Sequence, residues 1–294
     1  MPFSFHTHSG EFCNHASGRL EEVILRAIEL KFDTIGLTEH VPRFEQEFLY
    51  PEESELKPSD LATKFEAYYK KANELKLKYK GKINILIGAE LEYINEDHCN
   101  QLHSYLSKFN FDYLMGSLHH VNNIPIDFDQ QTFSLALKSY NNDMEALSLQ
   151  YFEDQFNLIK KFHPKVIGHF DLIRLFASQD YQLSSDIKEK IDRNIRYIVE
   201  YGGLFEINTR SLKKSLPYPY PQPDILKMIL ELGGKVTLSD DSHGAKDVGM
   251  HYDKVLDYLS LMGIDKVYYL VNSENQVKVE EFKGFENWFN NKFK

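Results

Sequence analysis

The sequence predicts a closed α/β barrel, and three observations support this prediction. The chain has 294 residues, a length that suits one barrel of ~250 residues with insertions. Short β-rich segments alternate with helical patterns from end to end, which indicates a parallel sheet. No Ser/Gly-rich linker, low-complexity tract or internal repeat divides the sequence. With seven or eight such βα units, closure into a barrel is favoured over an open sheet.

The individual elements follow from periodicity and from residues that begin or end helices. We predict strands at residues 3–8, 34–38, 83–90, 112–117, 166–168, 204–208, 236–239 and 267–271. Helical spacing of apolar residues predicts helices near 20–28, 59–75, 96–108, 187–198, 224–232 and 255–262, and two more between 131 and 162. Ser17 is the expected N-cap of the first helix, Ser59 opens the second, and Gly233 ends the helix at 224–232.

The composition excludes several classes of protein. Lys and Arg number 34 against 44 Asp and Glu, a net charge of -10, which argues against binding to nucleic acid or to an anionic membrane. The only two cysteines, Cys13 and Cys99, indicate a reducing compartment without a disulfide framework. Apolar runs fall far short of the ~20 residues of a membrane span, and the N-terminus has no basic leader region. We therefore expect a cytoplasmic protein.

Polar and ionisable side chains gather where the predicted strands end. In a closed barrel the carboxyl ends of all strands face one rim, so residues far apart in sequence meet there. Seven of the twelve histidines lie at or just past a strand end: His6, His8, His15, His40, His119, His169 and His243. Carboxylates lie at equivalent positions, namely Glu39, Glu90, Asp171, Asp240 and Asp241.

This set of residues predicts a site for several metal ions. Buried imidazoles and carboxylates cost free energy unless they are paired, whereas their nitrogen and oxygen atoms suit Zn²⁺, Mn²⁺ and Fe²⁺. Alternate residues of a strand face the same side, so His6 and His8 can bind one ion together. Scattered surface histidines are the alternative, and the clustering at strand ends argues against it.

These motifs resemble those of the PHP (polymerase and histidinol phosphatase) superfamily, and within it the histidinol-phosphatases. The matching segments are His6-Thr-His8-Ser9, His15, Gly36-Leu-Thr-Glu-His40, Gly88-Ala-Glu90, Gly116-Ser-Leu-His119, Gly168-His169-Phe-Asp171 and Ser239-Asp-Asp-Ser-His243. Loop sequences typical of the histidinol-phosphatase branch include Thr38-Glu-His-Val-Pro42-Arg43, Ile124-Pro-Ile-Asp-Phe128, His169-Phe-Asp-Leu-Ile-Arg174 and Glu206-Ile-Asn-Thr-Arg210. The resemblance covers residues 3 to about 250.

The resemblance implies a distorted, TIM-like (β/α)7 barrel of PHP type that binds three divalent ions (Zn, Mn or Fe). It assigns to the first ion His6, His8, Glu90 and Asp241. The second ion shares Glu90 and adds His119 and His169, and the third takes His15, His40 and His243. Strand ends select eight of these nine ligands independently, while His15 rests on the resemblance. A shift in register would replace His119 by His120, or Asp241 by Asp240.

The resemblance further implies hydrolysis of L-histidinol phosphate to L-histidinol and phosphate, in histidine biosynthesis, by attack of a metal-bridging hydroxide. Asp241, Glu90 and His243 are the expected catalytic residues, with Asp241 as the candidate proton donor or relay to the leaving alcohol. We expect one domain over residues 1–294, with a core at about 3–272 and a tail at 273–294, in a monomer or homodimer. We expect its partner to be a small phosphate monoester, and we expect it to bind neither nucleic acid nor a membrane.

Substrate-binding residues are expected near the same rim. Guanidinium groups bind phosphate in a bidentate manner, which favours Arg174 and Arg210, with Arg43 as a weaker candidate. Glu11 and Asp171 are candidates to receive a cationic amine or to support metal-bound imidazoles. Four aromatic residues are candidates for the wall of the pocket: Phe44, Phe128, Tyr218 and Tyr220. Aromatic residues are abundant in this sequence, so core or surface packing explains any one of them better.

Two other functions and one other motif compete with this interpretation. The chain can instead be a promiscuous PHP-type phosphoesterase acting on other small phosphates, or a catalytically silent metal-binding module. Cys13 and Arg19 also match the Cys-x5-Arg loop of cysteine phosphatases. His15 lies inside that loop and already belongs to the metal set, so we do not predict a cysteine nucleophile.

Overall fold

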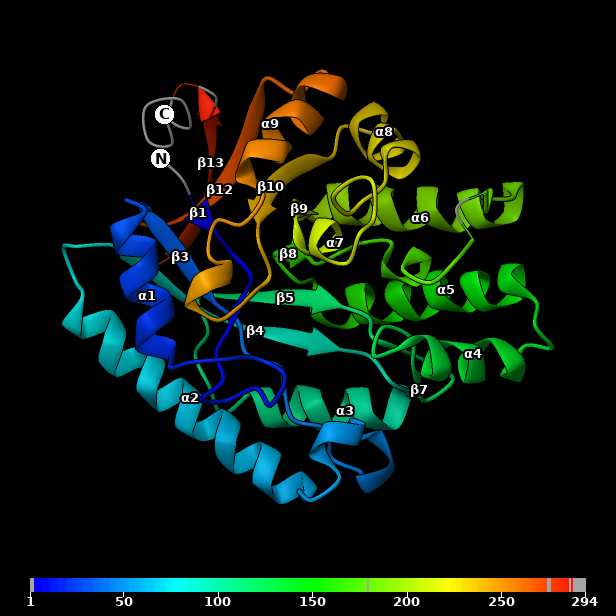
Figure 1. The fold of residues 1–294 in the computed structure, drawn as a ribbon, viewed down its shortest axis with the longest axis horizontal. Coiled ribbons are helices and arrows are strands. Elements are labelled where there is room, and N and C mark those ends of the chain that lie inside the picture. Colours follow the sequence, from blue (N-terminus) through cyan, green and yellow to red (C-terminus); the bar gives the residue numbers. More distant parts are fainter. Residues whose placement is uncertain (1–2, 179, 274–275, 286, 288–294) are drawn as a thin grey trace.

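Seven parallel strands curve into a nearly closed barrel with helices on its outside (Figure 1). The computed structural model describes residues 3–178, 180–273, 276–285 and 287. The strand order is β1 (Phe3–Ser4), β3 (Thr34–Leu37), β4 (Asn84–Glu92), β5 (Tyr113–Ser117), β8 (Val166–Ile167), β9 (Leu204–Asn208) and β10 (Lys235–Ser239). Every neighbouring pair is parallel. The predicted distorted (β/α)7 barrel is confirmed.

A short strand pair joins the first and last barrel strands at the rim. β2 (Thr7–His8) continues β1 after a two-residue break, and β11 (Ser242–His243) follows β10. The two segments pair in parallel, with His8 opposite His243. Below this pair, the Ser4 hydroxyl donates to Asp240 Oδ1 at 3.0 Å. The barrel is therefore closed at the carboxyl ends of its strands, where the predicted metal ligands lie.

Helices connect the strands and cover the barrel. They are α1 (Leu20–Glu29), α2 (Pro58–Lys78), α3 (Glu96–Leu106), α4 (Gln130–Ser139), α5 (Met144–Phe162), α6 (Ser185–Tyr201), α7 (Arg210–Lys213), α8 (Pro223–Glu231) and α9 (Tyr252–Leu261). Short 3-10 turns are η1 (Gln46–Phe48), η2 (Pro51–Glu53), η3 (Leu172–Arg174) and η4 (Ala245–Asp247). Within the described residues, no helix is both long and apolar enough to cross a membrane.

Two predicted helix starts are wrong by a few residues. The N-cap of α1 is Arg19 rather than Ser17, because the Ser17 hydroxyl instead donates to the carbonyl oxygen of His243 at 3.2 Å. α2 begins at Pro58, one residue before Ser59, since proline is favoured in the first helical turn, where its missing N–H costs nothing. Ser17 thus ties the loop after β2 to β11.

The last predicted strand lies outside the parallel sheet. β12 (Lys266–Ser273) pairs antiparallel with β13 (Gln276–Lys283), and the two strands form a separate two-stranded sheet. Phe3, at the start of β1, stacks on Tyr269 with ring centroids 5.4 Å apart and contacts Phe282 edge-on at 6.4 Å. The hairpin therefore covers the amino-terminal end of the barrel, opposite the rim of histidines. The expected tail from residue 273 provides β13, and Trp288 lies outside the described residues.

A tyrosine inside the barrel supports the floor of the site. The buried Tyr113 hydroxyl donates to the carbonyl oxygen of Phe5 at 2.7 Å, one residue before His6. A Cβ at Gly36 would collide with this hydroxyl and lie 2.9 Å from Tyr113 Cζ. Glycine is therefore required at position 36 because the tyrosine ring crosses the barrel next to β3.

Candidate metal centre

Glu90 lies at the centre of the histidine cluster. It is 1% exposed near the end of β4, and five imidazoles surround its carboxylate. The distances to Oε1 are 3.0 Å from His6 Nε2, 3.4 Å from His119 Nε2 and 3.3 Å from His169 Nε2. Those to Oε2 are 3.3 Å from His8 Nε2 and 2.8 Å from His40 Nδ1. One carboxylate can thus serve two ions on opposite sides.

Asp241 faces His6 and His8 from across the barrel. Its Oδ1 lies 3.6 Å from both His6 Nε2 and His8 Nε2, and 3.4 Å from His243 Nδ1. The backbone at Asp241 has a φ of 48°, a left-handed conformation that is uncommon outside glycine. This turn directs the side chain into the cluster between β10 and β11.

Contacts distinguish the two residues at each position where the register was ambiguous. His119 Nε2 faces Glu90 and lies 3.2 Å from His169 Nε2, whereas His120 Nδ1 binds Glu92 behind the cluster. Asp240 accepts hydrogen bonds from the backbone N–H groups of Ser242 and Gly249, at 3.1 and 2.6 Å, and so stabilises the loop after β10. His119 and Asp241 are therefore the side chains that join the cluster.

Carboxylates lie beside the far nitrogens of three of these histidines. Glu206 Oε1 lies 2.8 Å from His6 Nδ1, Glu39 Oε2 lies 3.5 Å from His8 Nδ1, and Glu52 Oε1 lies 3.1 Å from His15 Nδ1. Metal-binding histidines usually have such a partner, which fixes the ring and its tautomer. Sequence reasoning assigned no such role to these three acids. For two of them the sequence held a signal that could have identified them as partners of metal-binding histidines. Glu39 adjoins His40, and Glu206 lies near a strand end, two residues before Asn208.

The cluster fits divalent metal ions. Several of its buried atoms have no hydrogen-bond partner and face one another, including His6 Nε2, His8 Nε2, His40 Nε2, Glu90 Oε2 and Asp241 Oδ1. Desolvated lone pairs of this kind are costly unless a cation meets them. The group formed by His6, His8 and Glu90 and the one formed by His8, Asp241 and His243 each place one ligand atom per residue within 4.8 Å.

Electrostatics in the cluster favour a cation. Burial lowers the pKa of His40 to about 3 although Glu90 is adjacent, so this imidazole is neutral and presents a lone pair. Burial also acts to lower the pKa of His119, but Glu90 outweighs it and raises that pKa to about 9. In His6 the carboxylates of Asp241, Glu90 and Glu206 likewise outweigh burial and raise the pKa. The carboxylates attract positive charge, which a metal ion supplies in place of protons.

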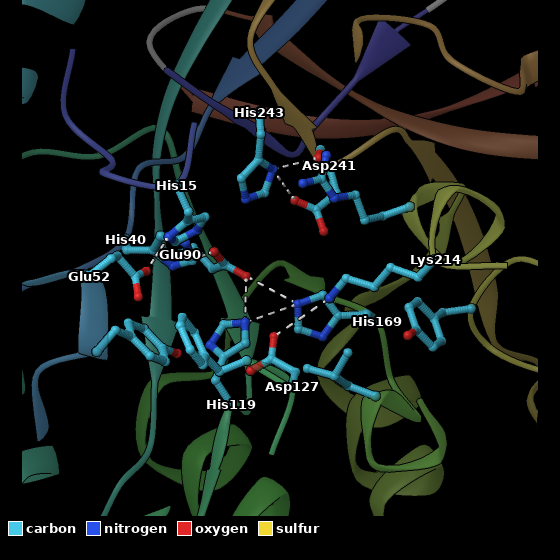
Figure 2. Close-up of a pocket in the computed structure, with 15 residues that line it drawn as sticks. His15, His40, Glu52, Glu90, His119, Asp127, His169, Lys214, Asp241 and His243 are labelled. Carbon is cyan, nitrogen blue, oxygen red and sulfur yellow. Dashed lines mark hydrogen bonds and ion pairs between the residues drawn. The ribbon is translucent and has the colours of Figure 1, made fainter. Parts of the chain in front are cut away.

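A cavity of about 220 Å³ opens directly above the cluster (Figure 2). Besides the cluster residues, its walls include Tyr50, Glu52, Asp127, Phe128, Leu172, Arg210, Lys214 and Tyr220. Lys214 Nζ lies 3.9 Å from Asp127 Oδ2, so a cation and an anion face the same space. The rings of Tyr50 and Phe128 stack with centroids 6.1 Å apart. The cavity thus presents charge of both signs and an aromatic wall.

Comparison with known proteins identifies the family. The family model described as PHP domain matches residues 4–210. A Schizosaccharomyces pombe protein named "Probable histidinol-phosphatase" is 48% identical over 268 residues, covering 90% of this chain and 88% of that protein. The histidinol-phosphatase of Saccharomyces cerevisiae is 34% identical over 309 residues, covering 92% of each. This chain belongs to the PHP-domain histidinol-phosphatase family.

Two solved structures share the fold of this family member. HisK from Listeria monocytogenes aligns with a TM-score of 0.74 at 27% identity, covering 86% of this chain and 99% of that chain. The histidinol phosphate phosphatase of Lactococcus lactis, solved with Zn, L-histidinol and phosphate, aligns with a TM-score of 0.71 at 20% identity, covering 94% and 98%. Members of the family are phosphoric monoester hydrolases, and this chain carries groups of His, Asp and Glu side chains that can hold a metal ion.

The predicted substrate residues of this family member occupy different places. Arg210 lines the cavity, with Nη1 2.8 Å from Asp247 Oδ2. Three others are absent from the cavity lining: Arg174 pairs with Asp224 at 2.6 Å, buried Arg43 pairs with Glu53 at 2.5 Å, and Glu11 accepts from the Leu20 N–H at 3.1 Å. Phe128 and Tyr220 line the cavity, while Phe44 packs on His98 and Tyr218 on Tyr258.

Four other polar cavity residues were missed by sequence reasoning. Asp127 and Lys214 come from loops 87 positions apart and meet only in the fold. Glu52 and Tyr50 come from the proline-containing segment after β3. Asp127 lies in the Ile124–Phe128 loop, so its position in a family motif was the one signal that could have identified it.

Proposed function

We propose that this chain hydrolyses L-histidinol phosphate to L-histidinol and inorganic phosphate with three divalent ions, Zn, Mn or Fe. One observation carries the proposal: Glu90 and the eight other predicted ligands, from around the barrel rim, cluster directly beneath a cavity with charges of both signs. The two fungal relatives support the choice of substrate, because this chain matches them over 90% and 92% of its length.

Three ligand sets support a count of three ions. The first set comprises His6, His8, Glu90 and Asp241, the second Glu90, His119 and His169, and the third His15, His40 and His243. Divalent ions held there would neutralise phosphoryl charge and lower the pKa of water toward 7. Glu90 contributes to two sets and keeps them adjacent.

The chain's own residues would bind and orient the substrate. Arg210 and Lys214 line the cavity and can bind phosphoryl oxygens. Asp127 can accept the ammonium group of an amino alcohol, and the Tyr50 and Phe128 rings can pack against an imidazole. Arg174, Glu11 and Arg43 make other contacts, so Arg210 alone of the four predicted residues is retained.

Asp241 is the proposed group that moves a proton toward the leaving alcohol. It lines the cavity with His243 and Arg210. Burial opposes its ionisation, but His6, His243 and Arg210 outweigh burial and keep the pKa of Asp241 below its usual range. An anionic Asp241 can accept a proton and pass it on as a relay. Glu90 and His243 would act by holding their ions and by keeping Asp241 in place.

Phosphate release from L-histidinol phosphate, with and without chelator, tests the function when combined with elemental analysis. We expect release that stops on chelation and returns with Zn, Mn or Fe, and about three ions per chain. Undiminished release with chelator, and less than one ion per chain, would overturn the proposal. Equal kcat/KM for p-nitrophenyl phosphate or nucleotides would favour the promiscuous phosphoesterase instead.

A further inference from the structure

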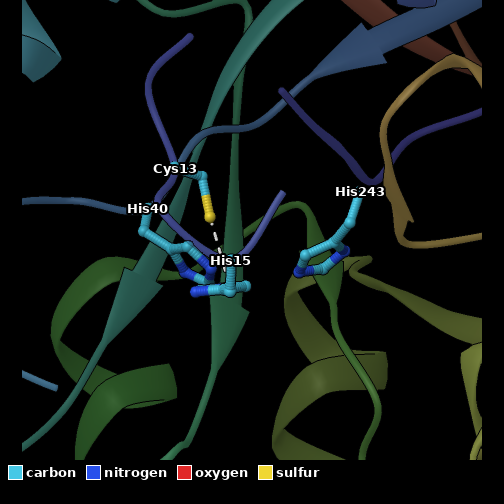
Figure 3. A group of neighbouring side chains, drawn as sticks. All are labelled: Cys13, His15, His40 and His243. Atoms are coloured by element: carbon cyan, nitrogen blue, oxygen red, sulfur yellow. Dashed lines mark hydrogen bonds between the residues drawn. The ribbon is translucent and has the colours of Figure 1, made fainter. Parts of the chain in front are cut away.

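We propose that the thiolate of Cys13 is a fourth protein ligand of the ion assigned to His15, His40 and His243. The inference rests on the proposed function for the presence of that ion. Cys13 lies in the loop after β2, two residues before His15, and its side chain points toward the three histidines (Figure 3). When the ion binds, the Sγ–H bond breaks, the proton passes to solvent, and sulfur donates an electron pair to the ion.

The geometry of the four residues matches one coordination sphere. Each offers a ligand atom, and these atoms lie within 4.8 Å of one another. Cys13 Sγ is 3.2 Å from His15 Nε2, the nitrogen left free when Glu52 holds Nδ1. Zinc bonds of ~2.3 Å to sulfur and ~2.0 Å to nitrogen place such atoms ~3.5 Å apart in a tetrahedron. A small outward movement of Sγ or Nε2 therefore admits an ion.

A second atom points to the same ion. His40 Nε2 is buried and has no hydrogen-bond partner, although Nδ1 of the same ring faces Glu90. The ring centroid of His15 is 5.3 Å from that of His40 and 4.9 Å from that of His243. The three imidazoles therefore surround the space that Cys13 Sγ borders.

The alternative partners of Cys13 face other side chains. Cys13 also groups with His8 and Glu39. However, Glu39 Oε1 accepts from the backbone N–H and the hydroxyl of Ser9, at 2.8 and 2.7 Å, and Oε2 faces His8 Nδ1 at 3.5 Å. His8 Nε2 faces Glu90 at 3.3 Å, within the first ion's ligand set. Cys13, only 6% exposed, already contacts His15 through its sulfur, so the ion of His15 is the one that it can reach.

A thiolate changes which metal this position prefers. Soft sulfur ligands favour zinc, whereas sites made only of nitrogen and oxygen also accept manganese. One cysteine and three histidines also supply four protein ligands, the number found in closed structural zinc sites. The third position would thus retain zinc while the ions beside Glu90 exchange, and it would fasten the loop after β2 to β3 and β11.

Cobalt(II) spectroscopy of the intact protein tests the inference without using activity. Metal-stripped protein loaded with Co(II) should show ligand-field bands and a near-ultraviolet thiolate-to-cobalt band. With only two cysteines in the chain, Cys13→Ser should lose the near-ultraviolet band and keep the ligand-field bands. Cys99→Ser is the matched control, since Cys99 is buried in α3 away from the cluster, and it should keep both.

X-ray absorption of the unmodified zinc protein is the second measurement, because it does not depend on folding of a variant. A sulfur neighbour of zinc at ~2.3 Å is expected. Cobalt bound with ligand-field bands but without a thiolate band, together with zinc lacking sulfur, would overturn this inference and leave the phosphatase proposal intact. Failure to bind any metal would overturn both.

Discussion

His8 and His243 stand opposite each other in the short strand pair that joins the first and last barrel strands, with ring centroids 4.6 Å apart. His8 belongs to the segment that continues the first barrel strand, and His243 to the one that follows the last. Each also lies near Asp241 Oδ1, at 3.6 Å and 3.4 Å. The strand pairing that closes the barrel therefore also brings together cluster residues from the two ends of the chain.

Glu90→Gln should remove metal and activity together. The amide loses the charge that offsets the ions, and one of its two oxygens, although the size is unchanged. We expect loss of at least one ion per chain and a fall in kcat of ~10²-fold or more. Elemental analysis and phosphate release measure the two effects. Retention of three ions with full activity would contradict the central role of Glu90.

Glu206→Gln should weaken metal binding through His6 without removing a ligand. Glu206 lies 2.8 Å from His6 Nδ1 and accepts from the His169 N–H at 2.6 Å. Loss of such a carboxylate typically lowers metal affinity ~10–100-fold, which a competition titration with a coloured chelator measures. Glu231→Gln, on the exposed side of α8, is the control and should leave affinity unchanged. Equal affinities for the two variants would exclude this positioning role.

Asp127→Asn should raise KM for L-histidinol phosphate and spare p-nitrophenyl phosphate, which has no amine. A hydrogen bond to a charged group contributes ~1.5–3 kcal/mol, or about tenfold to a hundredfold in KM. Lys214→Gln should weaken the binding of both substrates, because both carry a phosphate group. Asp129→Asn is the control on the same loop, since Asp129 caps α4 and is absent from the cavity lining. A uniform loss for both substrates in Asp127→Asn would refute amine recognition.

Asp154→Asn should stabilise the protein increasingly as pH rises from about 4 to about 6. Burial raises the pKa of Asp154 to about 6, so the native carboxyl keeps its proton to a higher pH than the unfolded chain. The free energy of unfolding of the wild type therefore falls by up to ~3 kcal/mol between about pH 4 and about pH 6. The amide of the variant does not titrate, so the variant avoids this loss. Gln150 donates to Oδ1 at 2.9 Å, which asparagine can also accept. Urea unfolding of the wild type and the variant at pH 4.5 and 7.5 gives the difference in their free energies of unfolding. If that difference is the same at both pH values, the prediction is wrong.

Gly36→Ala should destabilise the barrel by ~1–3 kcal/mol, the usual cost of overpacking. The new methyl group would collide with the Tyr113 hydroxyl. Adding Tyr113→Phe removes the hydroxyl and should recover part of the lost stability. The recovery should be incomplete, because Cζ of the ring still lies 2.9 Å from the new methyl group. Thermal unfolding of the two single variants and the double variant measures the coupling. Strict additivity would show that the two residues do not collide.

Local patterns predicted the barrel and the histidine cluster because both depend on strand ends. Leu204–Asn208 forms a strand over the predicted range, and buried Ile187, Ile191, Ile195 and Ile198 face the barrel from α6 as their spacing indicates. The β12–β13 hairpin was not predictable in this way. An isolated β-rich segment such as Lys266–Ser273 does not specify whether its partner is parallel or antiparallel.

Long-range ion pairs decided what the sequence could not reveal about substrate binding. Arg174 and Arg210 both follow barrel strands, but Asp224 holds the first and the second borders the cavity. Arg174 in η3 and Asp224 in the first turn of α8 are 50 positions apart, and only the fold brings this carboxylate to the guanidinium group. Asp127 and Lys214 were missed for the same reason.

The pairing of β2 with β11 makes the ends of the chain interdependent. Residues 4–210, which the family model matches, contain neither Asp241 nor β11. A fragment ending there would form an open sheet with two ligand positions lost and the Ser17 tether to His243 removed. During synthesis, the barrel can therefore close and the histidine cluster can assemble only after residue 243 has been added.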